Sequence, residues 1–253
     1  MEQTLTIYKN EGETPLECLD RFRVEQPIYK DAVLSYAGRL DPMAEGVMLV
    51  LVDEENKNRE KYLSLDKTYE VEILFGVKTD TGDILGKVEE VRNVPTEKDV
   101  NEVLQSFVGP FVQKYPSYSS KTVDGKPLFQ WAREGRLGEI EIPERISEIY
   151  SIELLDKRFL SAEDIIVQVR ERIAKVKGDF RQEEIMASWE AVSLPSVQES
   201  AKSAKMSAKM PIIRIQVKCS SGTYMRTLAE KVAEKLDTIG LAWSINRLGY
   251  GSL

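Results

Sequence analysis

The chain has 253 residues, 42% of them hydrophobic and 30% charged, which is enough to bury a substantial core in one large domain or two smaller ones. It contains no histidine and only two cysteines, Cys18 and Cys219. This excludes Ser-His-Asp and Cys-His catalysis and argues against a Cys/His zinc site or a disulfide framework. Acid, base or nucleophilic chemistry therefore depends on carboxylates, lysines, tyrosines, arginines and hydroxyls.

The net charge of −7 argues against a protein whose whole surface binds nucleic acid. A local basic segment is still present, because residues 201–226 contain no acidic side chain and six basic ones: Lys202, Lys205, Lys209, Arg214, Lys218 and Arg226. The segment fits either a solvated basic surface or an RNA-facing one, and composition does not choose between them.

Nothing in the sequence indicates a membrane span or a signal peptide. The longest apolar run, residues 47–52, is too short to cross a bilayer, and the N-terminus lacks a basic start. A cytoplasmic location without membrane association is expected.

The first part of the chain predicts strands and one short helix. Residues 5–8 are typical of a strand, and residues 14–22 of a helix with Thr14 as N-cap and Pro15 at its first position. Residues 47–52 predict a buried strand, and residues 69–75 alternate as in a half-buried one.

The middle of the chain alternates between turns, helices and strands. Residues 79–86 form a turn cluster, and the apolar spacing of residues 96–107 predicts a helix. A short helix over residues 128–135 and a strand over residues 146–155 follow.

A helical hairpin is predicted over residues 161–192, with Ser161 as a cap and Gly178-Asp179 dividing the two helices. The biased Ala/Lys/Ser stretch 196–210 is expected to be a mobile loop. A strand over residues 212–218 and an amphipathic helix over residues 227–236 complete a sheet with interspersed helices.

Asp41 is the most informative carboxylate. It precedes Pro42 and lies between Gly38 and Gly46, on a tight loop before a buried strand. Rigidly held loops often carry catalytic groups, but Asp-Pro also starts ordinary turns, and the residues by themselves favour the structural turn. Glu45 is not expected to pair with Asp41 as in a glycosidase, because the proline and glycines disfavour an aligning helix.

Residues 38–47 (Gly-Arg-Leu-Asp-Pro-Met-Ala-Glu-Gly-Val) resemble the nucleophile motif of the TruB family of pseudouridine synthases, Gly-x-Leu-Asp-Pro-x-Ala-x-Gly-Val/Met. Three further motifs follow in the family's order: 66–69 (Asp-Lys-Thr-Tyr), 79–83 (Thr-Asp-Thr-Gly-Asp) with Gly86, and 219–227 (Cys-Ser-Ser-Gly-Thr-Tyr-Met-Arg-Thr). A weaker motif begins at Pro116. Together they span nearly the whole catalytic region of the family.

The resemblance implies that Asp41 is the catalytic nucleophile, that Tyr69 stacks on the target base, and that Arg226 is the ion-pair partner of Asp41. No cofactor and no metal are implied. Without the motifs, Tyr69 would be interpreted as a core aromatic and Arg226 as an exposed charge in the first turn of a helix. An arginine beside a pocket carboxylate would keep that carboxylate ionised and oriented.

Further residues are candidates for substrate binding. The resemblance implies that Arg39, Lys67, Tyr118 and Tyr224 contact the substrate or support its pocket, and that Ile245 corresponds to a family leucine near the base. Tyr36 stands where the family usually has a histidine thought to help open the RNA loop, and a tyrosine could still stack on a base.

The fold implied is the α+β pseudouridine synthase fold, a central mixed, mostly antiparallel sheet flanked by helices, as a single domain over residues 1–253. Residues 161–210 are interpreted as an insertion between two strands, and the family's PUA domain is expected to be absent. The implied function is isomerisation of uridine to pseudouridine in RNA, at uridine 55 of the tRNA T-loop, by a monomer. Two alternatives are an RNA chaperone with weak or lost catalysis and a carboxylate hydrolase that does not act on RNA.

Overall fold

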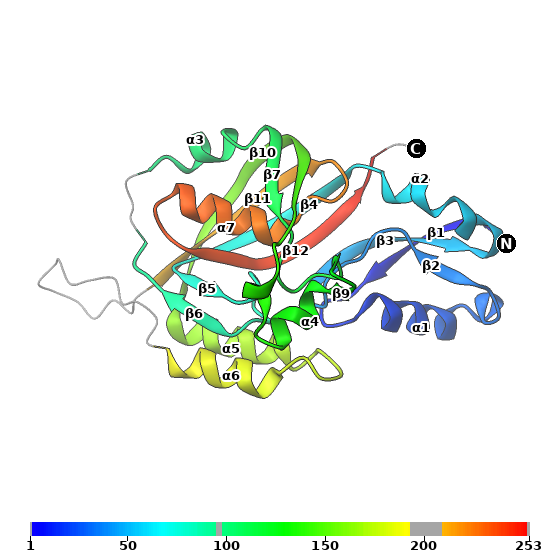
Figure 1. Cartoon of the computed structure of the whole chain (residues 1–253), viewed down its shortest axis with the longest axis horizontal. Coiled ribbons are helices and arrows are strands. Elements are labelled where there is room, and N and C mark those ends of the chain that lie inside the picture. The colour runs from blue at the N-terminus through cyan, green and yellow to red at the C-terminus, as the bar shows by residue number, and fades with distance from the viewer. Residues whose placement is uncertain (1, 95–97, 193–208, 252–253) are drawn as a thin grey trace, which may run out of the picture.

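The computed structural model describes residues 2–94, 98–192 and 209–251. Most strands join one sheet in the order β1-β3-β12-β4-β11-β10-β7, with β2 added beside β3 (Figure 1). These strands are β1 Thr4–Lys9, β2 Leu34–Tyr36, β3 Ala44–Val52, β4 Lys67–Phe75, β7 Gly109–Lys114, β10 Glu144–Ser161, β11 Lys209–Cys219 and β12 Gly240–Tyr250. The pairing of β3 with β12 is parallel and the other pairings are antiparallel, which confirms the mixed sheet.

The remaining elements are short strands and helices around this sheet. Two small hairpins pair β5 Val77–Thr79 with β6 Val88–Val91 and β8 Thr122–Val123 with β9 Lys126–Pro127. The α-helices are α1 Pro15–Glu25, α2 Arg59–Leu63, α3 Val100–Gln105, α4 Leu128–Arg133, α5 Ala162–Ile173, α6 Gln182–Ala191 and α7 Met225–Lys235. The 3-10 helices are η1 Pro27–Tyr29, η2 Asp53–Asn58 and η3 Leu137–Glu139.

Successive side chains of the central strands point to opposite faces of the sheet and pack in two different hydrophobic cores. On β11, Ile213 and Ile215 pack with α3 and α7, whereas Ile212 packs with α5 and α6. Strand β4 repeats the pattern, with Ile73 in the first core and Leu74 in the second. This period of two places α3 and α7 on one face of the sheet and the α5–α6 hairpin on the other.

The predicted hairpin is confirmed, and it connects the antiparallel neighbours β10 and β11. The Ser161 hydroxyl caps α5 by accepting from the Asp164 amide at 3.0 Å. Gly178 lies between the two helices with φ +79°. Of the predicted loop 196–210, residues 196–208 lie outside the described residues, and Lys209 and Met210 belong to β11.

Two predicted boundaries were wrong. Helix α3 begins at Val100, after the Asp99 side chain accepts from the Asn101 amide at 2.8 Å, and residues 96–97 of the predicted helix are outside the described residues. Strand β10 extends beyond residues 146–155 in both directions, because it pairs with β7 at its start and with β11 through to Ser161. Pairing partners distant in sequence extend a strand where its own residues do not alternate.

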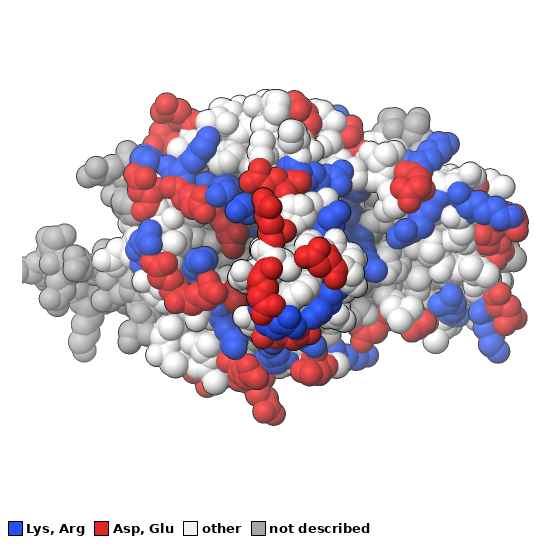
Figure 2. All heavy atoms as spheres, in the orientation of Figure 1, with Lys and Arg blue, Asp and Glu red and all other residues white. Residues whose placement is uncertain are grey.

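Acidic and basic side chains are intermingled over much of the molecule's visible face (Figure 2). The hollow to the right of α4 in this view is bordered by several Lys and Arg side chains (Figure 2).

Candidate active site

The Asp41 loop is a turn held from two sides. The Ala44 amide donates to the Asp41 carbonyl at 3.0 Å, and the Gly12 amide donates to the Pro42 carbonyl at 2.8 Å. The Lys9 ammonium, at the end of β1, donates to the carbonyls of Pro42 at 3.2 Å and Ala44 at 2.6 Å. The main chain around Asp41 is therefore fixed before any substrate arrives.

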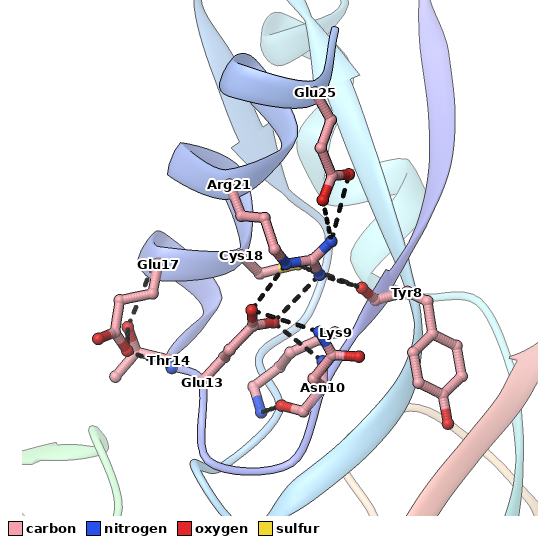
Figure 3. Close-up of polar contacts among 9 residues, drawn as sticks. All are labelled: Tyr8, Lys9, Asn10, Glu13, Thr14, Glu17, Cys18, Arg21 and Glu25. Atoms are coloured by element: carbon pink, nitrogen blue, oxygen red, sulfur yellow. Dashed lines mark hydrogen bonds and ion pairs between the residues drawn. The ribbon is translucent and has the colours of Figure 1, made fainter. Parts of the chain in front are cut away.

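Lys9 is itself enclosed by neighbouring elements. Its side chain is 0% exposed, and burial lowers the pKa of Lys9 to about 8. Beside it, Arg21 joins α1 to β1 by donating to Glu13 at 2.7 Å and to the Tyr8 carbonyl at 2.7 Å (Figure 3). Helix α1 thus anchors the strand that supports the Asp41 loop.

Arg226 lies in the first turn of α7 and contacts Asp41 directly. The distance from its Nε to Oδ2 of Asp41 is 2.9 Å, and a second carboxylate, Asp83, lies 3.8 Å from the same nitrogen. The Nε–Asp41 contact is an ion pair that meets the distance but not the angle of a hydrogen bond. The two terminal nitrogens donate to the carbonyls of Thr81 at 2.7 Å and Tyr118 at 3.1 Å.

The charged side chains at this contact differ in how far they are exposed to solvent. The Arg226 side chain is 5% exposed and that of Asp83 8%, but that of Asp41 is 41% exposed. Burial opposes the charge of Arg226, yet Asp41 and Asp83 outweigh it and raise the pKa of Arg226. Burial raises the pKa of Asp83 although Arg226 acts against this. A fixed cation thus supports a carboxylate that remains open to a ligand.

Asp41 and Arg226 line a pocket of about 410 Å³, within the roughly 300–1,000 Å³ typical of small-molecule sites. The structure brings five more of the predicted site residues to its wall: Arg39, Lys67, Tyr69, Tyr224 and Ile245. Residues far apart in sequence therefore meet around one carboxylate.

Tyr69, on β4, forms part of the buried wall and is 8% exposed. Burial raises the pKa of Tyr69 to about 12, so its hydroxyl is protonated at neutral pH. Arg247 is the register partner of Tyr69 on β12, is 1% exposed, and donates from Nε to the Val47 carbonyl at 2.8 Å. The pocket wall therefore combines an aromatic ring with a buried cation.

Two further residues of the pocket wall, Lys67 and Tyr224, are held by contacts with neighbouring elements. The Lys67 ammonium donates to the Leu63 carbonyl at 3.0 Å, and burial lowers the pKa of Lys67 to about 8. The Tyr224 amide donates to the Gln113 side chain at 2.9 Å, and the ring packs edge-on to Tyr115 at 5.6 Å.

Two predicted binding residues do not line this pocket. Tyr36, on β2, packs against the core beneath α1, and its carbonyl accepts from Arg59 at 3.3 Å. Tyr118 faces a second hollow of about 350 Å³, which shares Asp41 and Arg226 with the first pocket. The Tyr118 carbonyl holds Arg226, and its hydroxyl donates to Asp80 at 3.1 Å.

Sequence reasoning gave no role to Lys9, Asp83 and Arg247, although all three are buried at the site. Asp83 lay within the recognised motif of residues 79–83, so its motif position was an available signal. Arg247 and Lys9 are isolated charges in strand-like segments, and such charges inside a buried strand indicate a specific partner.

The described part of the chain contains no group of three or more Asp, Glu or Cys side chains arranged to hold a metal ion. Among the described helices, none is long and apolar enough to cross a membrane.

Two solved structures have a similar fold. A Cbf5-Nop10-Gar1 complex matches with a TM-score of 0.56 at 15% identity, covering 98% of this chain and 48% of the matched one. An H/ACA RNP bound to a substrate RNA containing 2'-deoxyuridine matches with a TM-score of 0.53 at 14% identity, covering 98% and 47%. The α+β architecture predicted from the sequence, the pseudouridine synthase fold, is confirmed.

The sequence comparisons identify the family within that class. The model of the TruB family pseudouridylate synthase N-terminal domain matches residues 27–178, so the chain belongs to the TruB family. The tRNA pseudouridine synthase B of Caldicellulosiruptor saccharolyticus is 29% identical over 252 residues, 99% of this chain and 68% of that protein. The Bacillus cereus protein of the same name is 30% identical over 239 residues, 93% of this chain and 62% of that protein. The chain thus spans about two thirds of the length of these relatives.

Proposed function

We propose that this protein is an RNA pseudouridine synthase, with uridine 55 in the T-loop of tRNA as its target. The observation that carries the proposal is the contact between Arg226 and Asp41 at the wall of a pocket that also contains Tyr69. Relatives named tRNA pseudouridine synthase B support tRNA as the substrate.

The reaction replaces an N-glycosidic bond by a C-glycosidic one. The bond between N1 of the base and C1' of the ribose breaks, and the base rotates within the pocket. A bond then forms between C5 and C1', and the proton on C5 is lost as N1 gains one. Asp41 starts detachment either by attacking the sugar or by removing a sugar proton, and both routes need its carboxylate ionised. Arg226 supplies the adjacent cation that pairs with this carboxylate at 2.9 Å.

Tyr69 and the buried wall hold the detached base. The aromatic ring offers a stacking surface for a uridine extracted from its RNA stack, and the enclosed pocket limits access of water during rotation. The phenol, protonated at neutral pH, can donate a hydrogen bond to the base or the sugar. The detached base is thereby kept close to C1'.

RNA reaches the pocket through a basic rim. Arg39, Arg59 and Lys121 line the pocket, and Arg39 is hydrogen-bonded to Ser120, which also lines it. Lys and Arg side chains border the hollow beside α4 (Figure 2). Phosphate groups on either side of the target uridine are suitable partners for these cations, despite the net charge of −7.

The test uses a uridine-labelled tRNA transcript and scores pseudouridine by position. We expect the wild type to modify uridine 55 and Asp41→Asn to form no pseudouridine, while its RNA affinity stays within about twofold, because the amide keeps the side-chain shape without the charge. Asp31→Asn, an exposed carboxylate outside the pocket, is the matched control and should behave as wild type.

The other outcomes are equally informative. Tight RNA binding by a wild type that forms no pseudouridine would support an RNA chaperone instead of an enzyme. Modification of a different uridine would retain the chemistry and refute the proposed target. The cytoplasmic location and the monomeric state remain predictions, the latter to be tested by sedimentation.

A further inference from the structure

The α5–α6 hairpin contacts two loops, one of which holds Arg226 and the other the Asp41 loop. It packs on the face of the sheet opposite α3 and α7, below β5 and β6 in Figure 1. Its polar contacts concentrate on two loops, residues 79–88 and residues 10–13. The first loop contains Thr81 and Asp83, which contact Arg226, and the second contains Gly12, which holds Pro42.

The tip of the hairpin inserts Arg181 between the first loop and Tyr118. Its Nη1 lies 2.8 Å from Oδ2 of Asp80, and both side chains are only 16% exposed. The guanidinium lies over the Tyr118 ring at 4.6 Å, and the Tyr118 hydroxyl donates to the same Asp80 oxygen at 3.1 Å. The Tyr118 carbonyl accepts from Arg226, so Tyr118 contacts both Arg181 and the Asp41–Arg226 pair.

The backbone at the tip is held in an unfavourable conformation. Arg181 has φ +64°, in the left-handed region that side chains other than glycine rarely adopt. Such a conformation persists where surrounding contacts compensate for it, and the contacts of Arg181 with Asp80 and Tyr118 provide that compensation. The strained backbone therefore indicates that the position of Arg181 against Asp80 and Tyr118 is fixed by these contacts.

Helix α6 adds two hydrogen bonds to the same loop. The Trp189 indole donates to the Gly86 carbonyl at 3.1 Å, and the Val88 amide donates to the Ser188 hydroxyl at 3.1 Å. Trp189 is fully buried. The loop that supports Arg226 is thus attached to the hairpin at several points along its length.

Helix α5 supports the Asp41 side of the pair. Arg172 donates from Nε to Glu11 at 2.8 Å, and the Lys175 ammonium lies 3.0 Å from the same carboxylate. The next residue, Gly12, approaches Lys175 so closely that an added Cβ would lie 2.6 Å from the Lys175 Cβ. Glu11 and Gly12 therefore connect α5 to the carbonyl of Pro42, adjacent to Asp41.

We propose that the hairpin is a brace that sets the position of the Asp41–Arg226 pair, with Arg181 as a positioning residue. The inference rests on the proposed function. Asp41 and Arg226 belong to separate loops, and their geometry depends on whatever connects those loops. A displacement of about 1 Å at a reacting group can reduce a rate by about 10²-fold.

The experiment compares single-turnover rate constants of pseudouridine formation at saturating protein with RNA dissociation constants from filter binding. Arg181→Ala is expected to lower the rate constant by at least about tenfold while the dissociation constant changes by less than about twofold. Arg181→Lys keeps the charge opposite Asp80 but not the planar stacking on Tyr118, and should recover part of the rate.

Two variants within the hairpin are controls. Arg170→Ala removes an exposed pair with Glu190 and should leave the rate constant and the melting temperature unchanged. Val169→Ala opens a gap in the buried core of the hairpin and should lower the melting temperature with little effect on the rate constant of the folded protein. If Arg181→Ala does not fold, Tyr118→Phe removes only the hydroxyl bond to Asp80 and should slow the reaction by about threefold or more.

Each result bears on the inference. An Arg181→Ala rate constant equal to that of the wild type would overturn it, as would a loss confined to RNA affinity, which would mean that Arg181 binds RNA directly. A rate loss shared by Val169→Ala would indicate general destabilisation and also overturn it. A wild type that is inactive on every RNA would refute the proposed function itself, and the brace with it.

Discussion

Arg226 is surrounded by more negative charge than it can neutralise. Besides Asp41 and Asp83, Glu230 lies one turn later on α7 and also interacts with this guanidinium. Burial raises the pKa of Glu230 to about 7, with Arg226 and Lys78 acting against the rise. At the residue scale, the site keeps its cation charged, whereas the neighbouring Glu230 carboxyl is only about half ionised near pH 7.

The raised pKa of Glu230 makes a pH-dependent contribution to stability. Its folded-state pKa of about 7 exceeds the ordinary 4.5, so the folded protein binds more protons between these values, and the stability contribution falls as pH rises through this range. Glu230→Gln, which mimics the protonated form, should therefore stabilise the protein at pH 8 by up to about 3 kcal/mol, and by close to zero at pH 4.5.

Thermal unfolding at the two pH values measures this difference. Glu234→Gln, on the exposed side of the same helix and paired with Lys231 at 2.6 Å, is the matched control for the substitution and should change stability by less than about 1 kcal/mol. A Glu230→Gln variant with the same stability change at both pH values would contradict the titration of this carboxyl.

At the scale of elements, the parallel pairing of β3 with β12 joins β1, β2 and β3 to the rest of the sheet beside the pocket. It requires an unusual backbone at Gly46, whose φ is +118° and whose register partner is Arg247. A Cβ added at Gly46 would lie 2.3 Å from the Arg247 carbonyl oxygen. Only glycine allows this approach, which also places the Arg247 side chain against the pocket wall.

Gly46→Ala should therefore destabilise the protein by roughly 3–5 kcal/mol, through a backbone clash and an unfavourable φ. Gly249→Ala is a matched change on β12, where no atom lies within 4 Å of the added Cβ. Urea unfolding of both variants measures the difference. Equal stabilities would show that the β3–β12 contact adapts without cost.

Several elements were predictable because their determinants are local. The α1 capping box uses Thr14 and Glu17, and the turn between α5 and α6 contains Gly178. The candidate site residues were identified through motifs instead, because Asp41 by itself resembled an ordinary turn. The contacts of Lys9 with the Asp41 loop and of Arg247 with the pocket could not be predicted, because they join segments separated by many residues.

At the scale of the whole molecule, the net charge of −7 conceals the basic rim of the pocket. Arg39, Arg59 and Lys121 come from three separate segments, and only folding assembles them around one pocket. Net charge affects solubility and long-range attraction, whereas RNA affinity depends on the cations that the phosphates contact.

Replacing these three side chains by glutamine should weaken RNA binding and reduce the slope of log affinity against log salt by about 2, since each phosphate contact contributes about 0.7–0.9. Replacing the exposed Lys30, Lys157 and Lys177, none of which lines the pocket, changes the net charge equally and is the control. Titrations at several salt concentrations provide the slopes. Equal slopes in the two triple variants would place the RNA elsewhere on the surface.

The sequence by itself determined the family, the order and type of most elements, and the carboxylate on which the proposed chemistry depends, because motifs, caps and turns are encoded by adjacent residues. Only the tertiary structure decided that Tyr36 packs beneath α1 and away from the pocket, that Asp83 and Arg247 are buried at the site, and that the hairpin contacts both supporting loops. Those features depend on the pairing of β3 with β12 and of β10 with β11. These pairings bring together segments that are distant in sequence, and their side chains are then buried against one another.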